Sequence, residues 1–252
     1  MFRTFIYVDE NNLYSYMRQI GVTSVAKPKT ETRSRHLSAS IPFAGVSGSI
    51  DKSVNSEYVQ DLGFDLDHFE NALEKLAGED YFDFVMNSDY NIFSIPPMRL
   101  IRLCCPFTIP EQFDIYNLIA QYKPIFLNSM GLEDEETQER EIIQAFFDNA
   151  SADIPIVADF GDIQISAKLN VNNLLEDYTD LEEYDEQSVY MLCKVIGVTN
   201  KDKVQIFDPL KDFIHLNRSM RRQQGMSSKE SNFEEIVIDG PVMKVEVIAM
   251  YK

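Results

Sequence analysis

The sequence is poor in the residues that most often build reactive or metal-binding sites. Its 252 residues include three histidines and three cysteines, and no tryptophan. Cys104, Cys105 and Cys193 form neither a CxxC motif nor a Cys/His spacing of the zinc type, which excludes ordinary zinc ribbons and fingers. We expect reduced structural thiols, as in cytoplasmic proteins, with Cys104 and Cys105 on opposite faces of a strand.

Motifs of nucleophilic and nucleotide-dependent enzymes are also missing. His36, His68 and His215 lie in no recognisable Ser/His or Cys/His arrangement. The spacing Gly45-x-x-Gly48 lacks the lysine that follows the glycines of a phosphate-binding loop. The sequence therefore predicts no cofactor and no resident metal, and it leans away from an enzyme.

Positive charge and long apolar runs are scarce. Lysine and arginine total 23 against 41 acidic residues, a net charge of −18. General binding to a nucleic-acid backbone needs clustered cations, so nucleic acid is not an expected partner. No apolar run reaches the roughly 18 residues of a membrane helix, and the N-terminus lacks a signal-peptide core. We expect a soluble cytoplasmic protein whose core is supplied by its 44% hydrophobic residues.

The clearest structural signal present is the stretch Thr4–Gly21. Its start predicts a buried strand, Phe5–Val8, followed by a helix that begins at Asp9. Asp9 is a good helix N-cap, and Gly21 is a good residue just beyond the helix end. The apolar spacing of a helix is given by Leu13, Tyr16, Met17 and Ile20.

The rest of the chain predicts an α+β fold, with a mixed or largely antiparallel sheet and packed helices. A capping box at Asp67 and Glu70 predicts a helix start, and 154–157 with 163–169 predict a β-hairpin. The acidic run Glu176–Glu186 marks a boundary between an α+β portion, 1–175, and a β-rich portion, 188–252. One continuous domain is the alternative. Further strands are expected at 98–107, 189–198, 204–207, 236–238 and 242–251.

A long polar arm, residues 22–60, follows the first helix and is rich in serine. It is locally basic, through Lys27, Lys29, Arg33 and Arg35. Three hypotheses remain open: a surface loop or hairpin, a partner-binding arm, or a membrane-inserting hairpin at 37–50. Pro42 interrupts the alternation that a membrane strand needs, so a membrane partner is not expected.

A second basic group lies near the C-terminal third of the chain. Its members are Arg218, Arg221, Arg222 and Lys229, which could meet a phosphate or an acidic run. Together with the arm, this group indicates contact surfaces for a protein partner, with self-association left open. The favoured function is a non-enzymatic interaction or sensor component.

The rival hypothesis is a divalent-metal nuclease. The phrase from Tyr7 to Leu13 resembles the opening of NYN/PIN-type nucleases, a likeness that implies metal binding by Asp9 with support from Asn12. The further acids of such a site should close later strands, yet Asp159 and Asp208 stand outside the expected motif. A helix cap is therefore the preferred interpretation of Asp9.

Both ends of the chain resemble an uncharacterised bacterial family, a domain of unknown function. The likeness lies in Phe5–Asp9 followed by Leu13–Tyr16 and Gln19, in the stretch Ser38–Ser49, and in Gly240–Val242 with Val245 and Ile248–Tyr251. The resemblance implies a bacterial protein with an association to defence genes. It implies no established activity, cofactor or catalytic residue.

Overall fold

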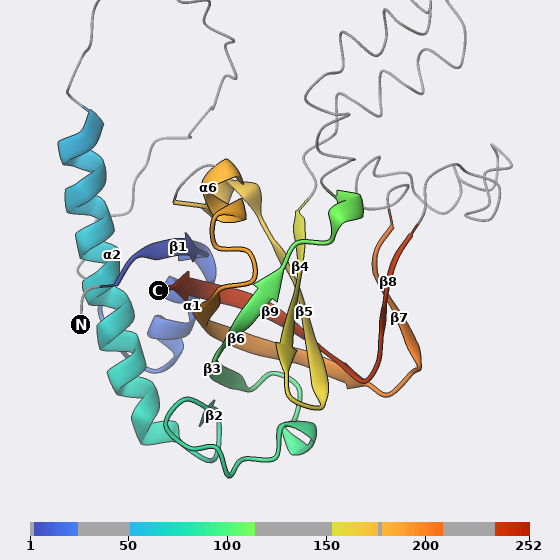
Figure 1. The fold of residues 1–252 in the computed structure, drawn as a ribbon. Helices are drawn as coiled ribbons and strands as arrows, with labels where there is room; N and C mark the ends of the chain where they lie inside the picture. Colours follow the sequence, from blue (N-terminus) through green and yellow to red (C-terminus); the bar gives the residue numbers. More distant parts are fainter. Residues whose placement is uncertain (1–2, 25–50, 114–152, 176–177, 209–234) are drawn as a thin grey trace, which may run out of the picture.

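A computed structural model describes residues 3–24, 51–113, 153–175, 178–208 and 235–252, with backbone alone for 51–60 and 179 (Figure 1). The predicted opening of the chain is confirmed. β1 (Phe5–Val8) is buried over its last three residues and leads through Asp9 into α1 (Glu10–Gln19). Gly21 adopts a φ of 75°, the left-handed conformation that ends helices at little cost for glycine.

The next helix, α2 (Asp51–Leu73), begins earlier than the sequence suggested. The loop or hairpin expected over 22–60 is therefore wrong for residues 51–60, and residues 25–50 lie outside the described part. The capping box at Asp67 and Glu70 is also wrong, because both residues lie inside the helix. Helices propagate easily once a packed segment nucleates them, here the buried stripe Leu62, Leu66, Phe69 and Leu73.

Seven strands of the described residues form one mixed sheet. The order is β1-β9-β5-β4-β3-β2, and β6 pairs with both β3 and β9. The pairings β3-β4-β5-β9-β6 thus close into a five-stranded ring, as in a small barrel. The bounds are β2 (Tyr81–Asp83), β3 (Leu100–Thr108), β4 (Ile154–Phe160), β5 (Ile163–Leu169), β6 (Ser188–Thr199) and β9 (Val242–Tyr251).

Two contacts in this sheet are parallel, β2 with β3 and β5 with β9, and the others are antiparallel. The predicted hairpin is confirmed, since β4 and β5 pair around Gly161 and Asp162. The α+β class with a mixed sheet is likewise confirmed. Short helices fill the connections: η1 (Glu74–Leu76), η2 (Ile92–Ser94), η3 (Val171–Asn173) and α6 (Tyr178–Glu182).

A bent two-stranded ribbon extends from the ring. β6 and β9 pair from Tyr190 with Tyr251 up to Thr199 with Val242. The same two chain segments continue as β7 (Lys203–Phe207) and β8 (Ile236–Asp239), which pair antiparallel outside the main sheet. Gly240 lies at the bend and donates its backbone N–H to the carbonyl of Asp202 at 3.0 Å.

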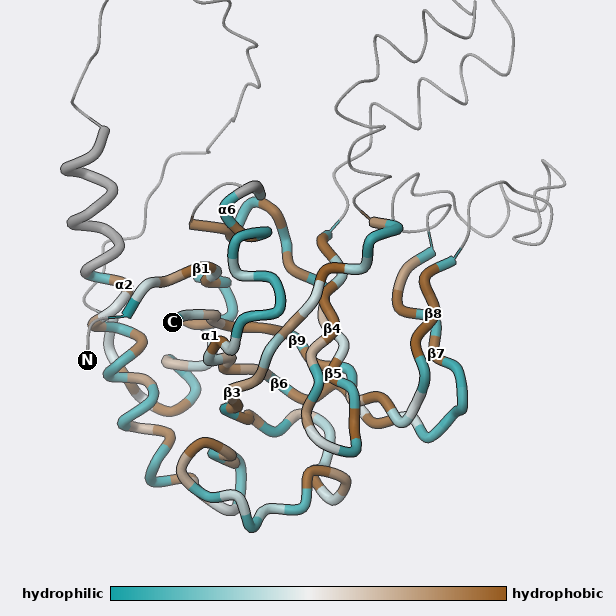
Figure 2. The backbone as a smooth tube through the Cα atoms, in the orientation of Figure 1, coloured by the Kyte–Doolittle hydropathy of each residue, from teal (hydrophilic) through white to brown (hydrophobic). Residues whose placement is uncertain are grey.

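The buried apolar residues divide between the inside of the ring and its outer surface beneath the helices. The inner group draws on β1, β3, β4, β5, β6 and β9, so both predicted portions of the chain, 1–175 and 188–252, contribute to one core. The outer group joins Leu13 and Met17 of α1 and the stripe of α2 to Leu192 and Ile248. Figure 2 shows hydrophobic residues running along the central strands and hydrophilic ones at several outer turns.

An ion network joins α2 to the sheet. Glu70 is 6% exposed, and its carboxylate accepts from Arg3 Nη2 at 2.8 Å, Arg102 Nη1 at 3.3 Å and the Tyr251 hydroxyl at 2.6 Å. Arg102 also pairs with Asp83 at 2.7 Å. Burial and the charge of Glu70 raise the pKa of Tyr251, so this hydroxyl stays a donor. Glu70 is therefore the acceptor that compensates two partly buried guanidinium groups.

Alkaline pH is expected to destabilise the fold through its buried thiols. Burial, with smaller effects of Cys104 and Asp159, raises the pKa of Cys105 to about 12 from the usual value near 9. The unfolded chain therefore releases this proton first, and stability is lost as pH rises from about 9 towards 12, by up to about 1.4 kcal/mol per pH unit for one thiol. Urea unfolding from pH 8 to 11 should show a shallower loss for Cys105→Ala. An unchanged slope would contradict this expectation.

Candidate functional site

The candidate site lies where one edge of β9 passes from one partner strand to another. On that edge, the pairing with β5 ends at Lys244 and the pairing with β1 begins at Ala249. The opposite edge stays paired with β6. A strand edge between two partners leaves room for side chains and ligands that a continuous ladder would fill. Glu246 lies on β9 between these two pairings. Around it lie the predicted Asp9 and Asn12 and several polar residues that the sequence did not predict.

Asp9 follows β1 directly and caps α1. Its Oδ1 accepts from the backbone N–H of Asn12 at 3.0 Å, and its Oδ2 accepts from Asn12 Nδ2 at 2.9 Å. The predicted N-cap is thereby confirmed. Both oxygens are engaged by one residue, and the backbone N–H of Asp9 donates to the carbonyl of Ile248 at 2.8 Å. The cap thus also fixes α1 against β9.

Asn12 links this cap to Glu246. Its Nδ2 donates to Glu246 Oε1 at 3.1 Å, while Glu246 Oε2 forms an ion pair with Lys194 on the neighbouring strand β6. Lys194 Nζ also donates to the Tyr16 hydroxyl at 2.7 Å. Burial lowers the pKa of Lys194, but the contacts with Glu246 and Tyr16 outweigh burial and raise it, which keeps the ammonium charged. These residues form the Glu246 network: Asp9, Asn12, Tyr16, Lys194 and Glu246.

The geometry of the Glu246 network suits structural support better than metal catalysis. Nuclease-type divalent sites need several acidic oxygens around one point. Here the Asn12 amide lies between the carboxylates of Asp9 and Glu246, and Lys194 forms an ion pair with Glu246. Within the described ranges, no group of three or more histidine, cysteine, aspartate or glutamate side chains is placed to hold a metal ion.

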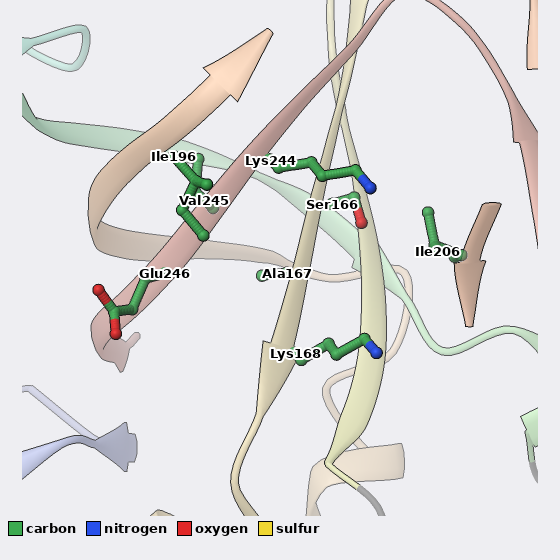
Figure 3. A pocket seen from close by; sticks show the side chains of 8 residues that line it. All are labelled: Ser166, Ala167, Lys168, Ile196, Ile206, Lys244, Val245 and Glu246. Carbon is green, nitrogen blue, oxygen red and sulfur yellow. The ribbon is translucent and has the colours of Figure 1, made fainter. Parts of the chain in front are cut away.

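A pocket adjoins the network where β5 and β9 diverge (Figure 3). Its volume is about 270 Å³. Ser166 and Lys168 come from β5, Lys244 and Glu246 from β9, and Ile206 from β7. The remaining lining residues are Ala167, Ile196 and Val245. Glu246 therefore belongs to both the network and the pocket.

Sequence reasoning brought together Asp9 and Asn12 but missed their neighbours. The alternating polar residues of 242–251 include Lys244 and Glu246, which was a usable signal for an outer strand face. Nothing in the sequence indicated that β5 runs beside them. The other predicted contact residues lie outside the described part of the chain: Lys27, Lys29, Arg33, Arg35, Arg218, Arg221, Arg222 and Lys229.

Loss of the cap should cost moderate stability. Asp9→Ala is expected to lower the free energy of unfolding by about 1 kcal/mol, because the first-turn amide of Asn12 loses its acceptor. Asp9→Asn should retain most of that stability, since asparagine is an equally good cap. Urea unfolding of the three proteins measures both effects. An asparagine variant as unstable as the alanine variant would contradict the capping role.

No curated protein and no solved structure matches the chain. No helix among the described residues combines the length and the apolar character needed to cross a bilayer. The family comparison covers nearly the whole sequence, including both ends that carried the resemblance noted above. With residues 2–251 matched, the chain belongs to the family described as a domain of unknown function, DUF6414.

Proposed function

We propose that this protein acts by binding a protein partner and not by catalysis, as an interaction or sensor component in the cytoplasm of a bacterial cell. The observation that carries the proposal is the connection between β2 and β3. It supplies four of the seven large apolar side chains that are exposed among the described residues: Val85, Met86, Phe93 and Met98. Apolar groups gathered in one exposed segment are typical of contact surfaces.

Hydrogen bonds fix the backbone of this connection. Asp83 Oδ1 accepts from the amides of Val85 and Met86, at 3.0 and 3.1 Å. The other end is held by Met98, whose N–H donates to the carbonyl of Val195 at 2.7 Å. Met98 adopts a φ of 70°, which is unfavourable for a side chain with a Cβ. A fixed backbone with exposed apolar side chains limits the entropy lost on binding.

Two further observations support the proposal, the first its non-catalytic part and the second its cytoplasmic location. Both oxygens of Asp9 are engaged by Asn12, and Glu246 is engaged by Asn12 and Lys194, so neither carboxylate is poised to act on a substrate. Cys105 and Cys193 are buried free thiols, as expected in a reducing compartment. The basic groups at 27–35 and 218–229 are proposed as additional contacts.

Partner capture from the native host tests the proposed contact surface. Met86→Lys should reduce the captured partner at least tenfold, because a charge would have to be desolvated at the contact. Val237→Lys is the matched control, since Val237 is also an exposed apolar residue but lies on β8. Equal capture by wild type and Met86→Lys would refute this surface.

A cleavage assay addresses the rival nuclease. Single- and double-stranded RNA and DNA are incubated with the protein in Mg²⁺ or Mn²⁺, beside the Asp9→Asn variant. We expect no cleavage above the rate seen with the variant. Metal-dependent cleavage by the wild type that disappears in Asp9→Asn would replace the binding proposal with a hydrolase.

A further inference from the structure

We infer that the pocket between β5 and β9 binds a small organic anion, with a phosphate-type head held by Lys168, Lys244 and Ser166. This inference goes beyond the proposed partner contact and does not depend on it. The β2–β3 connection contributes nothing to the lining of the pocket. Loss of ligand binding and loss of partner binding can therefore be observed separately.

The pairing of β5 with β9 determines which side chains enter the pocket. The strands run parallel, with Ser166 opposite Lys244, and the register ends at this pair. Lys168 lies two residues further along β5 and therefore on the same face. Figure 3 shows the ammonium ends of both lysines and the hydroxyl of Ser166 pointing to the same side, towards Ile206.

Two of the eight residues that line the pocket are lysines, in a chain whose net charge is −18. Lys244 Nζ has one long contact, 3.5 Å to the carbonyl of Gln205, and no ion pair with any described residue. The acid of the pocket, Glu246, points away from the ammonium group of Lys244 in Figure 3 and pairs instead with Lys194. The charge of Lys244 thus remains available for an anion.

Ser166 contributes a hydroxyl donor beside Lys244. The residue is 7% exposed and lines the pocket. A phosphate oxygen between Ser166 and Lys244 would accept from both groups.

The remaining walls indicate that the ligand also has an apolar part. Ile206 and Val245 are buried, and Ile196 is 55% exposed at the rim. A volume of about 270 Å³ exceeds what a bare phosphate fills and suits a small ring or chain attached to it. Phenyl phosphate therefore represents the inferred ligand class, and phenol represents the same aromatic ring without the phosphate group.

Titration calorimetry and ¹⁵N-correlation spectra of the full chain test the inference. We expect saturable binding of phenyl phosphate, at least tenfold weaker binding of inorganic phosphate, and no saturable binding of phenol. The backbone amide signals of Ser166, Ala167 and Val245 should shift with the same affinity as the calorimetric titration. Shifts confined to other regions would overturn the assignment to this pocket.

Matched variants distinguish a specific phosphate site from nonspecific attraction of the anion to surface lysines. Lys244→Met and Lys168→Met should each weaken phenyl phosphate at least tenfold. Lys75→Met removes the same charge from η1, outside the pocket, and should bind within twofold of wild type. Equal weakening by Lys75→Met, or benzoate binding more tightly than phenyl phosphate, would overturn the phosphate site. Ser166→Ala should weaken binding severalfold and provides a variant that keeps both charges if a lysine variant fails to fold.

Discussion

Glu70→Ala is expected to lower the free energy of unfolding by about 3–5 kcal/mol, because it removes a buried carboxylate that pairs with two arginines. Arg3 and Arg102 would lose the acceptor they share, and the Tyr251 hydroxyl would lose its 2.6 Å hydrogen bond. The side chains of Arg3 and Arg102 are only 24% and 16% exposed, so water replaces the lost carboxylate poorly. Urea unfolding at pH 7 measures the difference.

Asp67 provides the matched control for this prediction. It lies on the same helix and also pairs with Arg3, at 2.8 Å, but its side chain is 55% exposed. Asp67→Ala should therefore cost at most about 1 kcal/mol. If both alanine variants lose the same stability, burial of Glu70 does not control the strength of the network.

Gly240→Ala is expected to cost about 1–3 kcal/mol or more, because there is no space for a Cβ at the bend of the ribbon. A Cβ at this position would lie 1.9 Å from the carbonyl oxygen of Lys201. Backbone atoms cannot move aside as the end of a flexible side chain can. Relief of the clash would separate Gly240 from Asp202 and break their 3.0 Å hydrogen bond. Urea or thermal unfolding reports the loss.

Gly197→Ala is the control within the same ribbon. Gly197 lies in β6, and a Cβ there would have no heavy atom within 4 Å. Its substitution should change the free energy of unfolding by no more than about 0.5 kcal/mol. A large loss at Gly197, or none at Gly240, would show that steric clash at the bend is not the controlling factor.

Local signals in the sequence were sufficient for several elements. The strand and helix around Asp9 were predicted because their apolar spacing, cap and terminal Gly21 all agree. The β4–β5 hairpin followed from two short apolar runs with Gly161 between them. The resemblance at the two ends of the chain pointed to an uncharacterised domain family, and the family comparison also shows a domain of unknown function.

Tertiary context decided the features that the sequence missed. Asp67 and Glu70 have the spacing of a capping box. Glu70 instead lies inside the helix, where its carboxylate accepts hydrogen bonds from the partly buried Arg3 and Arg102. The candidate site depends on β5 meeting β9, which are separated by more than 70 residues of sequence. Local periodicity carries no information on such pairing, so Lys168 and Lys244 could not be placed together.

In the proposed non-catalytic function, the carboxylates of Asp9 and Glu246 are held by protein donors and not by a metal. Broadening of the Asn12 side-chain amide signals by Mn²⁺ tests this claim directly, because Asn12 lies between both acids. We expect these signals to broaden no earlier in a Mn²⁺ titration than the backbone amide of Gly161, in the exposed turn beside Asp162. Selective broadening of the Asn12 signals at substoichiometric Mn²⁺ would contradict this and identify a metal centre.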